Sequence, residues 1–190
     1  MVVIGVIAIF AALAVPAVDA ISGANARKAA GELAGAMRYL FDTAALRHAT
    51  CRLALDLDGR AWWAECAPGR AGIARDAERE DDEARRLEER FPDERSAEAR
   101  KLLARTEFGS FEDRIVGKRE LPGATAFGKV SVEGRRSAVE SGTAYVYFFA
   151  GGRAQRAHVP IADGSTHFTV VLEPFTGRAR VHPGDVEVRE

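Results

Sequence analysis

The sequence predicts an α+β protein in which one long N-terminal α-helix packs on antiparallel β-sheet. Residues 1–18 are an uncharged apolar run, residues 26–44 continue it as an amphipathic helix, and short β-prone segments follow from residue 51. A helical segment followed by strands that alternate with turn residues is typical of this fold class.

Composition limits the classes of function. The chain has 190 residues and a mass of 20.5 kDa, the size of one domain. A formal net charge of -1 argues against a dedicated nucleic-acid binder, which is usually strongly basic. Two cysteines are too few for a disulfide scaffold or a four-cysteine zinc site.

The first segment, MVVIGVIAIFAALAVPAV, contains no charged or polar side chain. A cleavable signal peptide would need a basic start, and a buried core helix would be apolar on one face only. We therefore favour a membrane-inserted helix, with Pro16 kinking or opening it near its end. The residues expected to face lipid or neighbouring helices are Val2, Val3, Ile4, Val6, Ile7, Ile9, Phe10, Leu13 and Pro16.

The helix continues beyond this run with one apolar stripe, and its charged residues fall between the apolar ones. We expect a single helix to about residue 48, with a transmembrane or filament-core half (1–22) and an amphipathic half (23–50). A β-rich globular domain is expected over 51–190. The stripe consists of Ala26, Ala30, Leu33, Met37, Leu40, Phe41 and Ala44, and the polar face of Arg27, Lys28, Glu32, Arg38 and Asp42.

A β-hairpin is predicted next, with strands CRLALDL (51–57) and AWWAEC (61–66) joined at Asp58-Gly59, a strong two-residue turn signal. A turn centred on that pair places Cys51 opposite Cys66. Directly opposed residues have about the separation that a disulfide needs, so we expect a disulfide there, with two free buried thiols as the alternative. Trp62 and Trp63 point to opposite faces, so one is expected in the core.

A charged insert interrupts the β-rich part at about residues 67–107. Nineteen of the 27 residues in 75–101 are charged, with mixed signs, which predicts solvated helices broken at Pro92. The alternative is a docking surface for a partner. After the insert, strands are predicted over 126–132, 144–149, 153–161, 167–172 and 178–181.

The sequence contains no recognisable catalytic or metal-binding pattern. Its serines lack a nucleophile-elbow context and its glycines lack a phosphate-loop pattern. We therefore expect no enzymatic activity, no cofactor and no metal. The scattered histidines are His48, His158, His167 and His182.

The apolar N-terminal segment resembles the first helix of type IV pilins and type II secretion pseudopilins, and Pro16 matches the proline of that helix. The basic leader, the glycine before the cleavage site and the N-terminal Phe and Glu of those families do not precede it here. We therefore assign no processing residue, and we expect the natural chain to begin upstream of Met1.

Two further stretches resemble the pseudopilin H family, which includes FimT-like minor pilins. RYLFDTAALRHATCRLALDLDGRAWWAE is similar to its helix-to-hairpin region, and FTVVLEPFTGRARV is similar to its final hairpin. The resemblance implies a pilin-like fold and a minor pseudopilin, a structural subunit of the periplasmic pseudopilus involved in protein secretion. It also implies a methylated N-terminus and a single pass through the bacterial inner membrane, with the globular domain in the periplasm.

The partners implied are other pseudopilins or pilins, the inner-membrane assembly platform and the lipid bilayer. Two alternatives stay open: a FimT-like minor type IV pilin in pilus assembly or DNA uptake, and a secreted soluble binding domain with a signal peptide. Arg178 and Arg180 are the only closely spaced basic pair in the last hairpin, and Asp185, Glu187 and Glu190 follow. That acidic tail weakens the case for nucleic acid as a partner.

Overall fold

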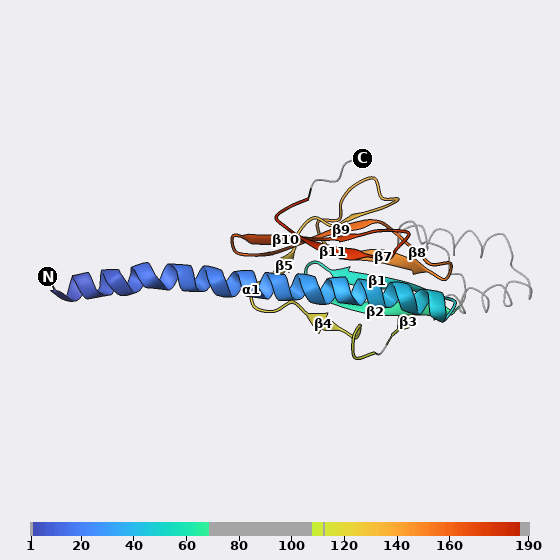
Figure 1. Ribbon diagram of the computed structural model, residues 1–190, viewed down its shortest axis with the longest axis horizontal. Coiled ribbons are helices and arrows are strands. Elements are labelled where there is room, and N and C mark those ends of the chain that lie inside the picture. The colour runs from blue at the N-terminus through green and yellow to red at the C-terminus, as the bar shows by residue number, and fades with distance from the viewer. Residues whose placement is uncertain (1, 69–107, 112, 187–190) are drawn as a thin grey trace, which may run out of the picture.

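The computed structural model describes residues 2–68, 108–111 and 113–186, and for residues 2–22 it describes the helical backbone only. Helix α1 (Val2–Leu46) extends from the N-terminus, and its C-terminal part lies along two antiparallel sheets (Figure 1). The predicted arrangement of one long N-terminal helix packed on antiparallel sheet is confirmed.

The amphipathic pattern of α1 correctly predicts its orientation. Six of the seven stripe residues are fully buried and Phe41 is half-buried, whereas the five charged residues between them are exposed. The helix ends at Leu46, two residues earlier than predicted. His48 then adopts a left-handed conformation, with φ of 50°, and Arg47 N donates to Thr43 O at 2.9 Å. A left-handed residue after the last turn is a common way to end a helix.

The first sheet has the strand order β3-β2-β1-β7-β8, and β4 also pairs with β2. The predicted hairpin register is confirmed, because Cys51 lies opposite Cys66 and Leu55 opposite Trp62. Trp62 is 2% exposed in the core, and Trp63 is half-buried on the other face. The strands are β1 (Ala49–Asp56), β2 (Ala61–Pro68), β3 (Gly109–Ser110), β4 (Arg119–Glu120), β7 (Thr143–Phe149) and β8 (Arg153–Ala154).

The connection between β1 and β2 is wider than the predicted two-residue turn. The strand pairing closes at Asp56 and Ala61, so residues 57–60 all belong to the loop. Gly59 N donates to Asp56 Oδ1 at 2.8 Å, and Arg60 takes the left-handed conformation, with φ of 50°. The Asp56 carboxylate thus caps the loop by accepting a hydrogen bond from its backbone.

The second sheet has the order β11-β10-β9-β5, and β6 pairs with β9. Burial alternates along β9, so Val159 and Ile161 face the core while His158 and Pro160 face outward. The strands are β5 (Ala126–Phe127), β6 (Ser131–Val132), β9 (Ala157–Asp163), β10 (Thr166–Leu172) and β11 (Ala179–Pro183).

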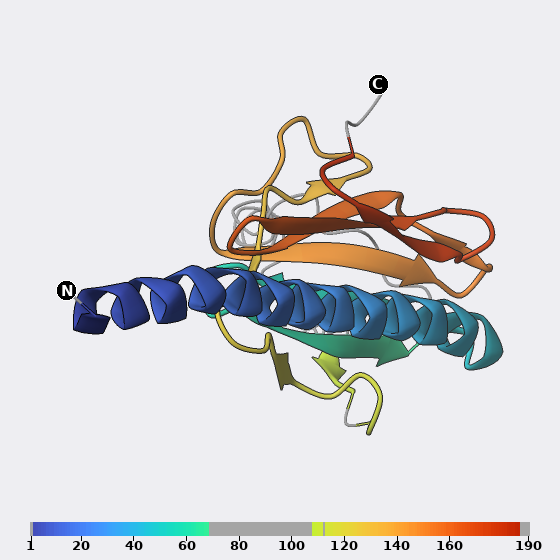
Figure 2. The same cartoon turned by 60° about the vertical axis from the view of Figure 1, so that its left-hand side comes forward.

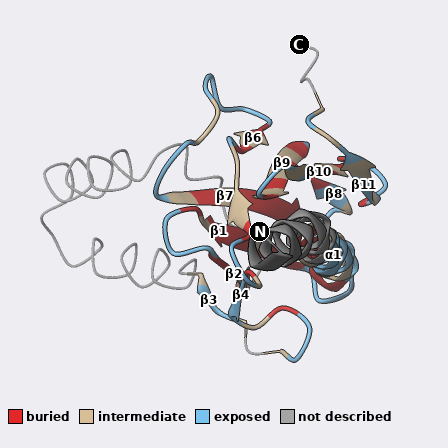
Figure 3. Ribbon diagram, turned by 90° about the vertical axis from the view of Figure 1, so that its left-hand side faces the viewer, coloured by how far each residue is buried: buried red, intermediate tan, exposed pale blue. Residues whose placement is uncertain are grey.

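Both sheets pack against α1, and one core lies between the three elements. In the view along the helix, the first sheet lies beside α1 and the second above it (Figure 3). Figure 2 shows the helix in front of the first sheet and below the second, and one face of the helix is left uncovered. The largest buried side chains of the core are Leu33, Met37, Leu40, Trp62, Phe148, Ile161 and Leu172.

Two predicted strands are each divided in the structure. The segment 126–132 forms β5 and β6, because Gly128 packs closely on Pro160 and Val130 pairs instead with Val139. The segment 153–161 is divided between the two sheets at Gln155. The Gln155 side chain accepts a hydrogen bond from Tyr147 N at 3.1 Å and donates to Glu133 O at 2.8 Å, which satisfies backbone groups where the chain crosses between sheets.

The charged insert predicted at about 67–107 falls almost entirely outside the described residues, as do the helices predicted within 75–101. Its first two residues belong to β2, which continues to Pro68. The described chain resumes at Phe108 and forms β3, where Gly109 lies opposite Cys66. The two ends of the insert are therefore held in adjacent strands.

Candidate functional site

The nine residues predicted to face lipid or neighbouring helices all lie on α1, in its N-terminal part. The backbone is helical throughout, including at Pro16, and their side chains lie outside the described residues. In the parts of the chain that are fully described, no helical segment combines the length and apolar character of a membrane span. The lipid contacts of residues 1–22 therefore stay a prediction.

The described part of α1 presents one open face. Gly31 and Gly35 lie on this face, four residues apart, and apart from the adjacent helix backbone nothing lies within 4 Å of the position that a Cβ on either glycine would occupy. The exposed charged residues Lys28, Glu32 and Arg38 flank them. Paired small residues let a second helix backbone approach closely, so this face offers room for a neighbour.

A groove of about 460 Å³ runs beside this face, between α1 and the segment 113–120. Trp62 and Ala36 lie beneath the groove and are almost fully buried, and Ile115, which is 46% exposed, supplies accessible apolar surface. Ion pairs border the groove: Arg119 Nη1 lies 3.9 Å from Glu32 Oε2, and Arg38 Nε lies 3.1 Å from Asp42 Oδ2. An apolar floor with a charged rim is the usual character of a protein-binding surface.

Asp113 connects the outer wall of this groove to the helix. Its Oδ2 accepts a hydrogen bond from Tyr39 Oη at 3.0 Å, and its Oδ1 accepts one from Ile115 N at 2.8 Å. The backbone hydrogen bond from Ile115, followed by that from Tyr39, lowers the pKa of Asp113 below its ordinary value. The segment that carries Ile115 is therefore held in place by a charged carboxylate.

Cys51 and Cys66 form a disulfide that joins β1 to β2. Cys51 is fully buried, and Cys66 lies opposite Gly109 of β3. The bond therefore crosses the sheet beside the place where the insert leaves β2. A persistent structural disulfide is typical of an oxidising compartment.

Arg52 forms the centre of a cluster on the face of the first sheet turned away from α1. Its Nε donates to Glu65 Oε2 at 2.6 Å, and its guanidinium lies 4.2 Å from the ring centroids of both Phe108 and Tyr145. Burial opposes the charge of Arg52, but hydrogen bonds with Tyr147 and Glu65 outweigh it, so its pKa is raised. The cluster holds Phe108, the first residue after the insert, against the sheet.

The four histidines show no catalytic or metal-binding arrangement. Among the described residues, no group of three or more His, Cys, Asp or Glu side chains is placed to hold a metal ion. His158 is half-buried, and this burial, followed by repulsion from Arg156, lowers its pKa. His167 Nδ1 lies 3.9 Å from Asp185 Oδ1 at the surface.

The sequence predicted the exposed face of α1 but not the groove beside it. Trp62, Ile115 and Arg119 lie far from the helix in the chain, and only the pairing of β4 with β2 brings Arg119 to Glu32. The pair Ile115-Val116 follows charged residues in the sequence, but the sequence alone does not show that Val116 is buried and Ile115 is exposed.

Comparisons with known proteins show the fold. No family model matches the chain, and no curated protein matches it. Among solved structures, two of the minor pseudopilin EpsH from the type 2 secretion system of Vibrio cholerae are similar, each with a TM-score of 0.54. They are 9% and 11% identical, and the alignments cover 86% and 87% of this chain and 99% of each EpsH chain.

At this identity the likeness is one of fold, and it shows that the chain has the pilin-like α+β fold of these pseudopilins.

Proposed function

We propose that this chain is a minor pseudopilin of a type II secretion system, a structural subunit of the periplasmic pseudopilus. The shape of α1 carries the proposal. The helix is continuous from Val2 to Leu46, its C-terminal part packs on the sheets, and its N-terminal part extends beyond them (Figure 1). An apolar helix that extends beyond a soluble domain has its partner in a membrane or in other helices.

The two halves of α1 have different tasks in this proposal. Residues 1–22 anchor the subunit in the inner membrane as a single pass and then join the helices of neighbouring pseudopilins during assembly. Packing among helices replaces the contact with lipid. The sheets lie in the periplasm, whose oxidising conditions suit the Cys51–Cys66 disulfide.

The open face of α1 supports a contact beyond the membrane half. Gly31 and Gly35 leave space at the helix surface, and the adjoining groove offers exposed apolar surface at Ile115. We assign this face to a neighbouring subunit whose helix runs alongside α1.

The experiment is complementation in the host. Deletion of the gene is expected to stop secretion of extracellular proteins, and the wild-type chain restores it. The double variant Gly31→Leu/Gly35→Leu is expected to fold, because leucine favours a helix over glycine by about 0.8 kcal/mol per residue. It should reach the membrane fraction but restore little secretion. Gly151→Leu is the matched control, since Gly151 also has open space around it.

Normal secretion in the deletion strain would overturn the proposal. If the deletion strain loses pili or DNA uptake while secretion stays normal, the chain belongs to a type IV pilus. Full restoration by the double variant would remove the open face of α1 from the assembly while leaving the pseudopilin assignment intact.

A further inference from the structure

A second concave surface lies on the far side of the second sheet from α1. It is a cleft of about 610 Å³ between the segment 133–138 and the outer face of β9. Ser131 of β6 lies opposite His158 of β9, and this pairing brings the segment that follows β6 alongside the β9 strand. The cleft is thus separate from the open face of α1.

The charge of this cleft is positive. Its lining includes Arg135, Arg136 and Arg156, and Glu133 is the one acidic residue in it. Glu133 is already engaged, because its Oε1 accepts a hydrogen bond from Arg153 Nη2 at 3.1 Å and its Oε2 accepts one from Arg156 N at 3.0 Å. With Glu133 engaged, Arg136 and Arg156 place positive charge along the surface of the cleft.

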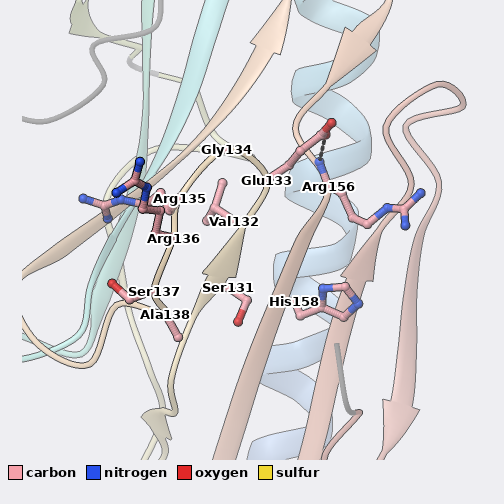
Figure 4. Close-up of a pocket in the computed structure, with 10 residues that line it drawn as sticks. All are labelled: Ser131, Val132, Glu133, Gly134, Arg135, Arg136, Ser137, Ala138, Arg156 and His158. Atoms are coloured by element: carbon pink, nitrogen blue, oxygen red, sulfur yellow. Dashed lines mark hydrogen bonds between the residues drawn. The ribbon is translucent and has the colours of Figure 1, made fainter. Parts of the chain in front are cut away.

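The positive groups stand at opposite sides of the cleft rather than converging on one point. Figure 4 shows the Arg135 and Arg136 side chains together on one side and the Arg156 guanidinium on the other, with Ser131 and His158 between them. A compact anion would reach one side only. An extended chain of acidic groups that crosses the cleft would meet both sides, and hydroxyl and imidazole groups lie in between.

The lining also distinguishes between two kinds of extended anion. Proteins that bind single-stranded nucleic acid combine a basic groove with aromatic rings on which bases stack. The lining of this cleft contains no Phe, Tyr or Trp. Guanidinium groups pair with carboxylates in a two-pronged geometry, which suits the side chains of Asp and Glu. The whole chain, moreover, has a net charge of -1 rather than a strongly basic one.

We infer that this cleft binds an extended acidic segment of a partner polypeptide, whose carboxylates pair with Arg136 on one side and Arg156 on the other. Half-burial of His158, which raises the cost of its charged form, keeps a neutral imidazole in the middle of the cleft. The inference is independent of the proposed function, since a pilin or a secreted domain could use the same cleft.

The test is peptide binding by the full chain in detergent micelles. The probe is a fluorescein-labelled peptide of alternating glutamate and serine, followed by fluorescence anisotropy at low ionic strength, where charge pairs are least screened. Arg136→Gln/Arg156→Gln is expected to weaken binding roughly tenfold or more, because each change removes a charge-assisted contact. The matched control is Arg27→Gln/Lys28→Gln, which removes two positive charges from an exposed part of α1.

The control pair is expected to bind within about twofold of the wild type, because its charges lie away from the cleft. An equal loss in both pairs, or no binding by the wild type, would overturn the inference. An oligonucleotide with the same label and charge serves as the second probe. If it binds more tightly than the peptide and depends on the same two arginines, the partner is a nucleic acid, and the acidic polypeptide is excluded.

Discussion

Gly177 lies against the ring of Phe41 so closely that a side chain on Gly177 would collide with that ring. Gly177 precedes β11 in the turn from β10, and its φ of 62° lies in the left-handed region that favours glycine. Beside it, Arg38 Nη1 donates a hydrogen bond to Thr176 O at 2.8 Å. The turn between β10 and β11 thus packs directly against α1.

We predict that Gly177→Ala lowers the free energy of unfolding by about 3 kcal/mol, because it adds overpacking against Phe41 to backbone strain. Gly164→Ala is the matched control. Gly164 has a φ of 59° and nothing within 4 Å of a Cβ, so it isolates the backbone strain, about 1 kcal/mol. Urea unfolding of the full chain in micelles, followed by circular dichroism, measures both.

A Phe41→Ala background tests whether the Phe41 ring causes the extra cost of Gly177→Ala. In a Phe41→Ala background, Gly177→Ala should cost no more than Gly164→Ala, because the colliding ring has been removed. If the two glycine variants cost the same in the wild-type background, the close packing of the turn on α1 is wrong.

The disulfide should contribute measurably to stability. Cys51 and Cys66 are separated by 15 residues, and closing a loop of that size stabilises a fold by about 3 kcal/mol in the chain-entropy account. We expect a reducing agent to lower the urea midpoint of the wild type. The variant Cys51→Ala/Cys66→Ala should start from the lowered midpoint and not respond to the reducing agent. A wild-type midpoint that is unchanged on reduction, with free thiols verified by titration, would contradict this.

Local features of the fold could be predicted from the sequence, because neighbouring residues determine them. The stripe from Ala26 to Ala44 sets which face of α1 is buried, and the turn at Asp58-Gly59 sets the register that pairs Cys51 with Cys66. The loop between β1 and β2 is longer than the predicted two-residue turn, because the Asp56 carboxylate caps it and Arg60 adopts the left-handed conformation. Side-chain capping of this kind leaves no periodic signal.

Features that depend on distant parts of the chain could not be predicted. The crossing between sheets rests on Gln155, whose partners Tyr147 and Glu133 lie 8 and 22 residues away. The basic cleft was missed for the same reason, because only the pairing of β6 with β9 brings Arg136 and Arg156 to one surface. The adjacent pair Arg135-Arg136 was visible in the sequence, but its neighbour across the cleft was not.

His158 should titrate below about pH 6.5, its ordinary value, because half-burial and then Arg156 disfavour its charged form. Glu173 opposes this shift, and His182 adds to it. We predict that Arg156→Gln raises the pKa of His158 and that Glu173→Gln lowers it further. The imidazole proton signals in NMR spectra recorded across the pH range measure both changes.

The lowered pKa of His158 also determines how the stability of the fold changes with pH. The unfolded chain takes up a proton at His158 as the pH falls through about 6.5, whereas the folded chain resists it until a lower pH. The contribution of His158 to stability is therefore lost as the pH falls through that window, and His158→Gln should flatten the pH dependence of the urea midpoint there. A variant with the same or a steeper dependence would contradict the burial of this imidazole.

The last prediction concerns the insert, whose ends are held in adjacent strands. Cys66 pairs with Gly109, so the register carried one step further places Ala67 opposite Phe108. Replacement of residues 69–107 by Asn-Gly should therefore leave a short hairpin, at least as stable as the wild type because long loops are costly to close. Removing residues 69–110 instead also removes β3 and the Phe108 ring beside Arg52, which should cost about 3 kcal/mol. If the shorter excision unfolds the protein as much as the longer one, residues 69–107 belong to the core, and their assignment as an insert is wrong.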